Sequence, residues 1–448
     1  MGDWHITTDM GKTADTQPNN HKRKLHWMQL DNAAKIYPAA RTRNWSNVFR
    51  LSATLTEKVD VDVLKSALNI TVRRFPSMAA RLRKGLFWYY IQEVPEAPEI
   101  SEESSYPLVK MHKDEVRKCA FRVIAYQKRI AVEFFHSLTD GNGGLVFLKT
   151  LVAEYLEQKY GVSVPAEHGV LDRREKPTQE EMEDCFLKVA GHLPASRKET
   201  DAYKITGTVE DRERMHLVCF KIPSDKVKAM SKEYDVTVTG LFAAILTKTM
   251  LEMQKNEVLH FMRQKPIKIL IPVDLRRMFQ SKSLRNFVLY MITEVDPRLG
   301  EYEFREICHI IKHQMALGIT PKNMSSMIAT NVAPDQKFIL RLAPLPLKNL
   351  VMKLIFNAVG ERKSCLSMSN LGKVTVPKPM EQYVERMDFF LSPPATLPYN
   401  CGILSYGDTV YVNFLRDIKE PRLELAMHEV MRDMGIVATV ESNRGNKE

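Results

Sequence analysis

The sequence lacks several features that would place it in common structural classes. It contains no run of 18 or more apolar residues, so we expect no membrane-spanning segment. The first residues have no apolar core of the kind that a secretion signal needs, and residues 1–24 predict a polar, disordered tail. The six cysteines are scattered and form no Cys-x-x-Cys pair, which suits neither a disulfide framework nor a zinc site. These absences predict a cytoplasmic protein with reduced thiols.

Familiar binding motifs are missing as well. The basic residues are not accompanied by a helix-turn-helix, zinc-finger or RNA-recognition pattern, so we expect no nucleic-acid partner. The glycine-rich residues 141–144 (GNGG) lack the spacing and the Lys-Ser/Thr pair of a phosphate-binding loop. His309 and His313 lie four residues apart on a predicted helix without a third ligand. We therefore expect neither a metal nor a bound cofactor.

What is present is the composition of a globular protein with a basic surface. The 448 residues could form two or three domains, and 44% are hydrophobic and 27% charged. The net charge of +11 is unusual. It is compatible with nucleic acid, with an anionic membrane surface, and with an anionic cofactor or acidic partner. For most individual lysines a generally basic, solvated surface is sufficient explanation.

One stretch joins a buried strand to a helix through a polar turn. Residues 130–135 (IAVEFF) are mostly apolar or β-branched, which is typical of a buried strand. Residues 145–160 carry apolar side chains at three- and four-residue spacing, which predicts an amphipathic helix. Between them lie His136, Asp140 and Gly141. A histidine at the tip of a buried strand can project its imidazole into a cleft, and Asp140 is close enough to fix the loop that carries it.

This His-x-x-x-Asp-Gly pattern resembles the signature of the chloramphenicol-acetyltransferase-like acyltransferases. That superfamily includes alcohol acetyltransferases, wax-ester synthases, plant acyltransferases and the condensation domains of peptide synthetases. Many members have two adjacent histidines at this point, of which the second is catalytic. In this sequence the first position is Phe135 and the second is His136, so the resemblance retains the catalytic one.

Two further matches follow in the order found in the superfamily. Residues 272–276 (PVDLR) precede a loop and then Asn286-Phe287 before a predicted strand. Residues 369–372 (SNLG) end another predicted strand, which is typical of the alcohol-acetyltransferase-like branch. The Asp-Phe-Gly-Trp-Gly sequence of the plant branch is absent. Three motifs in order make the resemblance far more specific than any one of them.

The resemblance implies an α/β (α+β) fold made of two similar halves. Each half would be a mostly antiparallel sheet with flanking helices, and the two would meet along a tunnel with the histidine at its centre. We expect the N-terminal half at residues 25–165 and the C-terminal half at residues 212–448. Residues 166–211 are charged, contain prolines and show little periodicity, and they predict a linker or crossover. We also expect a strand at residues 107–111 and a helix at residues 338–358.

The resemblance also assigns roles within the site. Histidine suits a general base because its ordinary pKa lies near neutrality, and His136 would act in a ternary complex without a covalent intermediate. Asp140 would support the loop through a salt bridge to an arginine, for which Arg276 is the positional match. An oxyanion donor is also needed, and Ser369 and Asn370 are candidates, as is the backbone N–H of Gly141 or Asn142.

The sequence thus predicts an acyltransferase that moves an acyl group from a thioester to an alcohol or amine. A coenzyme A thioester is the expected cosubstrate, with a small-molecule acceptor. One alternative is a condensation or offloading enzyme whose donor is carried by an acidic acyl carrier protein. Another is a non-catalytic member that binds a ligand in the same tunnel. A chain of this length can supply both halves of the tunnel, so we expect a monomer.

Overall fold

The computed structural model describes residues 25–40, 47–103, 106–191, 193, 200–210, 214–336, 342–358 and 363–444. The tail predicted at residues 1–24 lies outside these ranges. Within them, no single helix is long and apolar enough to cross a membrane. The helices α7 (Ser224–Glu233) and α8 (Val238–Glu257) reach that length and hydropathy only as a pair, and they are bent by 82° where they join.

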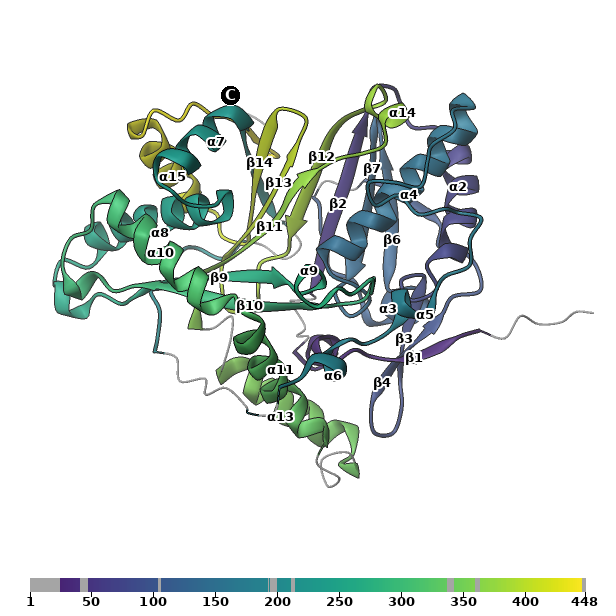
Figure 1. Cartoon of the computed structure of the whole chain (residues 1–448), viewed down its shortest axis with the longest axis horizontal. Helices are drawn as coiled ribbons and strands as arrows, with labels where there is room; N and C mark the ends of the chain where they lie inside the picture. Colours follow the sequence, from purple (N-terminus) through teal and green to yellow (C-terminus); the bar gives the residue numbers. More distant parts are fainter. Residues whose placement is uncertain are drawn as a thin grey trace, which may run out of the picture.

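Two lobes stand side by side, each built on a mixed sheet (Figure 1). The sheet of the first lobe has five strands in the order β12-β2-β7-β6-β5, and all its neighbours are antiparallel except β5 and β6. The strands are β2 (Val48–Leu55), β5 (Ile100–Glu102), β6 (Phe121–Tyr126), β7 (Arg129–Phe135) and β12 (Val384–Leu391).

The helix α4 (Gly141–Tyr160) covers this sheet, and the helix α2 (Val61–Arg74) packs on the outer side of α4. In the sheet, α4 contacts β2 and β7. Its side chains are buried on nearly every face along its first four turns, because the sheet lies on one side and α2 on the other. It begins at the N-cap Asp140 and ends at Gly161, whose left-handed φ of 68° is typical of a C-cap glycine.

A small three-stranded sheet lies below the first lobe in the order β1-β4-β3 (Figure 1). The strands are antiparallel and comprise β1 (Trp27–Gln29), β4 (Tyr89–Glu93) and β3 (Ala80–Lys84). The short elements of this part of the chain are η1 (Ala33–Lys35), α1 (Ile36–Ala40) and α3 (Lys113–Lys118).

The second lobe has a seven-stranded sheet in the order β10-β9-β11-β13-β14-β8-β15. Its strands are β8 (His216–Pro223), β9 (Ile267–Asp274), β10 (Val288–Val295), β11 (Leu366–Val374), β13 (Tyr399–Tyr406), β14 (Thr409–Arg416) and β15 (Thr439–Ser442). Only the β9–β11 and β11–β13 neighbours are parallel. The buried helix α8 packs against β9 and between α10 (Phe304–Gly318) and α15 (Arg422–Asp433). The remaining elements are α5 (Gln179–Met182), α6 (Phe186–Val189), η2 (Phe261–Arg263), α9 (Arg276–Phe279), η3 (Pro297–Leu299), α11 (Pro321–Gln336), α13 (Leu345–Ala358) and α14 (Lys378–Glu381).

Some local expectations were wrong. Residues 107–111 form no strand: Pro107 and Leu108 lie in a turn, where Leu108 has a left-handed φ of 57° and its N–H donates to Glu133 Oε1 at 2.9 Å. Of the helix predicted at residues 338–358, residues 338–341 lie outside the described ranges, and α13 covers Leu345–Ala358. The strand β12 lies within residues 212–448, the predicted C-terminal half, yet it pairs with β2 in the sheet of the first lobe.

The strand β12 also packs against the second lobe, so it forms the seam between the two sheets. Gly402 on β13 faces the backbone of Phe389 on β12, and a Cβ at this position would lie well inside van der Waals contact of the Phe389 carbonyl oxygen. Asn413 Nδ2 donates to that oxygen at 3.2 Å, and Asn400 Nδ2 donates to the carbonyl of Ser392 at 3.0 Å. The missing side chain of Gly402 thus permits the close approach on which these bonds depend.

We predict that Gly402→Ala destabilises the whole protein by about 1–3 kcal/mol, because the clash is with backbone that cannot rotate away. The measurement is the midpoint of urea unfolding followed by circular dichroism. Ser405→Ala, farther along the same strand, is the matched control and is expected to leave the midpoint almost unchanged. Equal midpoints for Gly402→Ala and the wild-type protein would contradict the prediction.

Candidate active site

His136 lies immediately after β7, at the place where the two lobes face each other. Its backbone N–H donates to the carbonyl of Asn47 at 2.9 Å, which continues the pairing of β7 with β2. The imidazole stacks on the ring of Tyr37, with centroids 4.7 Å apart, and the ring of Phe49 meets it at 63° with centroids 5.1 Å apart. Burial among these groups lowers the pKa of His136 below its ordinary value of 6.5. The side chain is therefore neutral at physiological pH.

Asn286 of the second lobe holds this imidazole in place. Its Oδ1 lies 3.0 Å from His136 Nδ1, while its Nδ2 donates to the His136 carbonyl at 3.0 Å and to Asp31 Oδ2 at 3.2 Å. The two partners of Nδ2 are acceptors, so the amide can have only this orientation. The oxygen therefore faces Nδ1, which must carry the ring proton. The lone pair is left on Nε2, as a general base requires.

Asp31 supports Asn286 from behind. Its side chain is fully buried, and its Oδ1 accepts from the N–H of Ala34 at 2.7 Å. Burial raises the pKa of Asp31 to about 6, against the opposing charge of Arg285, whose Nη2 lies 3.7 Å from Oδ2. Sequence reasoning assigned no role to Asp31 or Asn286. The only signal was the position of Asn286 in a motif, because Asp31, His136 and Asn286 are more than 100 residues apart from one another along the chain.

Asp140 points away from the imidazole and into the junction between the lobes. Its Oδ1 caps α4 by accepting from the N–H of Gly143 at 3.1 Å. Its Oδ2 accepts from Arg276 Nη2 at 2.8 Å and from the N–H of Phe287 at 2.9 Å. Arg276 also donates to the carbonyls of Ser283 and Arg285, each at 2.6 Å. The structure thus brings together Asp140 and Arg276, the pair that the resemblance implied.

The glycines after Asp140 fit closely against the second lobe. A Cβ on Gly141 would lie 3.0 Å from Leu371 Cδ2 and 3.2 Å from Phe389 Cζ. A Cβ on Gly143 would clash with the backbone carbonyl of Leu284, which accepts from Thr139 Oγ1 at 2.6 Å. The absence of side chains in this turn is therefore what allows the start of α4 to pack on the loop before β10.

Ser369 and Asn370 lie together on β11, where a bulge interrupts its pairing with β13. The Asn370 amide is occupied, because its Oδ1 accepts from the N–H of Gly372 at 2.8 Å and its Nδ2 donates to Thr239 Oγ1 at 3.1 Å. Within the described part of the chain, the Ser369 hydroxyl has no such partner. Of the two, Ser369 is the one that remains available to a ligand.

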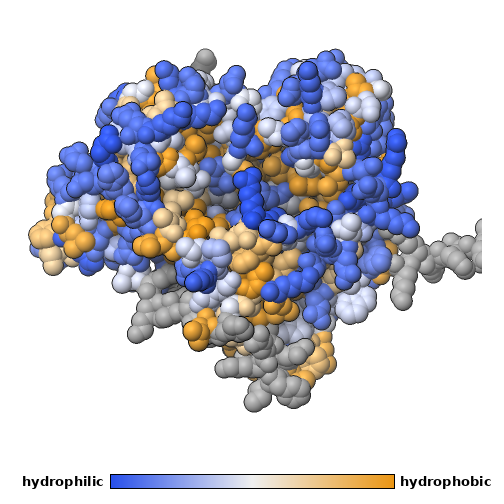
Figure 2. Space-filling model, viewed as in Figure 1, coloured by the Kyte–Doolittle hydropathy of each residue, from blue (hydrophilic) through white to orange (hydrophobic). Residues whose placement is uncertain are grey.

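The surface between the lobes is hollowed, and apolar residues are visible in the hollow (Figure 2). The described residues contain no group of three or more His, Cys, Asp or Glu that could hold a metal ion. His309 and His313 are exposed on α10. The arrangement at His136 is a neutral base in apolar surroundings, positioned by an amide from the opposite lobe.

No protein-family model matches the chain. Two uncharacterized proteins of Mycobacterium tuberculosis, Rv2305 and MT2362, come from strains H37Rv and CDC 1551. Each is 24% identical to the chain over 395 residues, which cover 82% of this chain and 89% of theirs.

Among solved structures, TRI101 of F. graminearum in complex with ethyl coenzyme A has a TM-score of 0.61 at 10% identity. That match covers 93% of this chain and 100% of that one. TRI3 trichothecene 15-O-acetyltransferase of Fusarium sporotrichioides has a TM-score of 0.59 at 12% identity, covering 92% and 94%. The first condensation domain of the CDA synthetase has a TM-score of 0.55 at 12% identity, covering 92% and 95%.

At such low identities the structural similarity establishes the fold alone, and the matches extend over almost the whole of each chain. They include both acetyltransferases and condensation domains. The predicted architecture of two lobes with mixed, mostly antiparallel sheets and flanking helices is confirmed. The chain has the fold of the chloramphenicol-acetyltransferase-like acyltransferases and condensation domains, the superfamily that its motifs resemble.

Proposed function

We propose that the chain is an acyltransferase that moves an acyl group from a thioester to an alcohol or amine, with His136 as the general base. The observation that carries the proposal is the pairing of His136 Nδ1 with Asn286 Oδ1 at 3.0 Å. This hydrogen bond supports a ring proton on Nδ1, which leaves Nε2 as the basic nitrogen. Burial lowers the pKa of His136, so the side chain stays neutral. The fold supports acyl transfer as the reaction class, since acetyltransferases share it.

In the proposed reaction Nε2 accepts the proton of the acceptor hydroxyl or amine as the nucleophile attacks the thioester carbonyl. The resulting tetrahedral intermediate carries a negative oxygen. When it collapses, the carbon–sulfur bond breaks and the imidazolium returns the proton to the leaving thiolate. The products are the ester or amide and the free thiol, so no other reactant is needed.

The negative oxygen needs hydrogen-bond donors that are already in place. The N–H groups of Gly141 and Asn142 are the first two of α4, and the first N–H groups of a helix have no intrahelical acceptor. The free hydroxyl of Ser369 is a second candidate. Asn370 is better explained as the residue that fixes the bulge of β11, because both ends of its amide are engaged.

Coenzyme A is the proposed carrier of the acyl group. The TRI101 structure that shares this fold holds ethyl coenzyme A, and the basic net charge of +11 suits a phosphorylated cosubstrate. The alternative donor is an acyl group on an acidic carrier protein, since a condensation domain also has this fold. A monomer that acts in the cytoplasm is the simplest setting for either reaction.

We predict that the wild-type protein releases free thiol from one or more acyl-CoAs only when an alcohol or amine acceptor is present. His136→Ala should lower this rate about 10²–10⁴-fold, the usual contribution of a general base. Thiol release is measured over a panel of donors and acceptors. His309→Ala is the matched control and should retain full activity, because its side chain is exposed on α10.

If folded wild-type protein releases no thiol with any pair, an acyl group loaded on a carrier protein is tested next. Activity there would identify the condensation alternative. Inactivity with both donors would contradict the proposed enzyme and favour a ligand-binding protein.

We predict that kcat/KM rises with pH through a single ionisation below the ordinary histidine pKa of 6.5, because burial disfavours the imidazolium. Asn286→Ala removes the acceptor at Nδ1, which favours the protonated ring, and should move the inflection to lower pH. The pH–rate profiles of the two proteins are compared. Identical inflections would show that Asn286 does not set the ionisation of His136.

We predict that Arg276→Gln destabilises the protein by about 3–5 kcal/mol, because it leaves the buried carboxylate of Asp140 without its cation. Asp140→Asn should cost less, because Arg276 keeps an ion pair with Asp274, whose Oδ1 lies 2.8 Å from Nη1. The double variant should lose much less than the sum of the two, since neither charge remains. Urea unfolding of all four proteins gives the coupling energy. Losses that simply add would mean that the ion pair contributes no interaction of its own.

A further inference from the structure

The helix α13 carries its polar and apolar residues on the wrong sides for a helix at a water-exposed surface. Lys348 is only 8% exposed, and its Nζ donates to the carbonyl of Phe87 at 3.1 Å and lies 3.5 Å from the centroid of the Trp88 ring. Asn349 Nδ2 donates to Tyr89 Oη at 3.0 Å. At Lys348 and Asn349, beyond the buried Leu345, the inner face of α13 therefore binds the small sheet and its turn through polar groups.

The outer face of the same helix is apolar. Leu347, Leu350 and Val351 are 53%, 57% and 46% exposed. Their spacing of three and four residues places them on one stripe. A helix of a globular protein normally turns such a stripe inward, and a contiguous exposed apolar patch marks a surface that meets a partner or a membrane.

The turn between β3 and β4 extends this apolar stripe. Leu86 is 74% exposed, Phe87 beside it is also exposed, and the Leu86 carbonyl accepts from the N–H of Leu345 at 3.1 Å. This hairpin and α13 both reach the lower edge of the molecule in Figure 1, where apolar residues are visible in Figure 2. We call the five residues Leu86, Phe87, Leu347, Leu350 and Val351 the basal surface.

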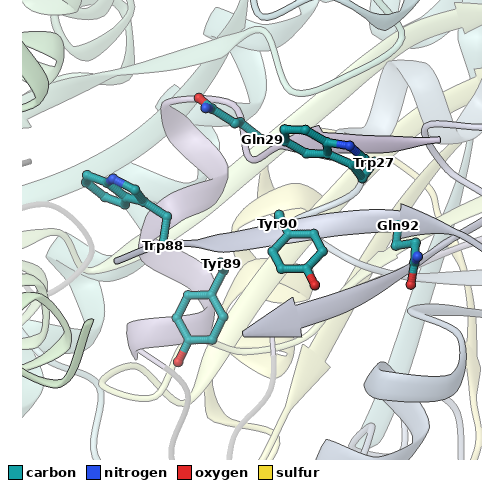
Figure 3. A pocket seen from close by; sticks show the side chains of 6 residues that line it. All are labelled: Trp27, Gln29, Trp88, Tyr89, Tyr90 and Gln92. Carbon is teal, nitrogen blue, oxygen red and sulfur yellow. The ribbon is translucent and has the colours of Figure 1, made fainter. Parts of the chain in front are cut away.

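Aromatic residues border the basal surface. A shallow pocket of about 440 Å³ lies on the small sheet, and Figure 3 shows the six side chains that line it. Four of them are Trp27, Trp88, Tyr89 and Tyr90, and the Trp27 side chain is largely exposed. Trp and Tyr are the residues enriched where proteins cross from water into the headgroup region of a bilayer.

Cations border it too, without acidic partners. Arg81 and Arg83 project side by side and both donate through Nε to Gln92 Oε1, at 3.1 and 3.3 Å. Partial burial and the neighbouring charge of Arg83 lower the pKa of Arg81. Residues 80–92 and 342–358 contain no Asp or Glu, and in the described part of the chain neither arginine forms a salt bridge. Arg81 and Arg83 can therefore bind an external anion.

We propose that the basal surface docks on an anionic lipid membrane, with its apolar residues in the headgroup and acyl-chain boundary and Arg81 and Arg83 against lipid phosphates. Exposed leucines, bordering Trp and Tyr, and cations without carboxylates are together the composition that binds at such an interface. Charge complementarity selects this occupant over a second copy of the chain, whose own edge has the same charge. No membrane-spanning helix is needed, because the surface lies on the bilayer.

The test is flotation of the full chain with vesicles of phosphatidylcholine, with and without phosphatidylglycerol. We expect binding to the anionic vesicles that weakens with added salt. Leu347→Ser combined with Leu350→Ser should lower the affinity at least tenfold. Arg81→Gln combined with Arg83→Gln should remove most of the preference for anionic lipid, since each charge near the surface contributes about fivefold.

The controls separate this surface from general effects. Leu299→Ser and Leu317→Ser change exposed leucines outside the basal surface and should bind as the wild type does. His136→Ala should also bind normally, so the result is independent of the proposed reaction. Failure of the wild-type protein to float with anionic vesicles would overturn the proposal. So would dimerisation that the Leu347 and Leu350 changes abolish while vesicle binding persists unchanged.

Discussion

The buried carboxylate of Asp140 is the constraint on which the rest of the site depends. One of its oxygens caps α4, and the other receives Arg276 and the N–H of Phe287 from the opposite lobe. Arg276 in turn binds two carbonyls of the loop at residues 280–287. That loop carries Asn286, which orients His136. The ion pair thus sets the position of the catalytic candidate through the loop, without touching the imidazole.

A general base must be neutral and must have its lone pair on the correct nitrogen. Different residues around His136 meet these two requirements. Tyr37 and Phe49 supply an apolar environment that disfavours the imidazolium, and Asn286 supplies a neutral acceptor that selects the tautomer. A carboxylate in the place of Asn286 would select the same tautomer but would also favour protonation. Asp31 accepts from the amide nitrogen and holds Asn286 from behind.

The sequence predicted the features that depend on local patterns of residues. A buried strand, a polar turn and a helix are adjacent along the chain, so the setting of His136 and Asp140 could be recognised from about thirty residues. The helix was expected to be amphipathic, but α4 is buried on nearly every face because α2 packs on its outer side. The contact between Asp140 and Arg276 spans 136 residues and was expected only from the resemblance. Asn286 and Asp31 lie in different lobes and carry no periodic signal. For α13, a helix was expected from the sequence, but the identity of its buried face depends on the hairpin that it contacts.

The strand β12 has a consequence for the order in which the chain can fold. Leu51 on β2 pairs with Phe389 on β12, which follows more than 300 residues later in the sequence. The edge of the first sheet beside β2 is therefore completed by a strand that is synthesised much later. During synthesis β2 would emerge as an unpaired edge, open to the strands of other chains. Closing so long a loop is slow, because its entropy is lost before the contacts form. The first sheet is therefore complete only after the last quarter of the chain has been synthesised. We expect the two lobes to fold as one cooperative unit for this reason.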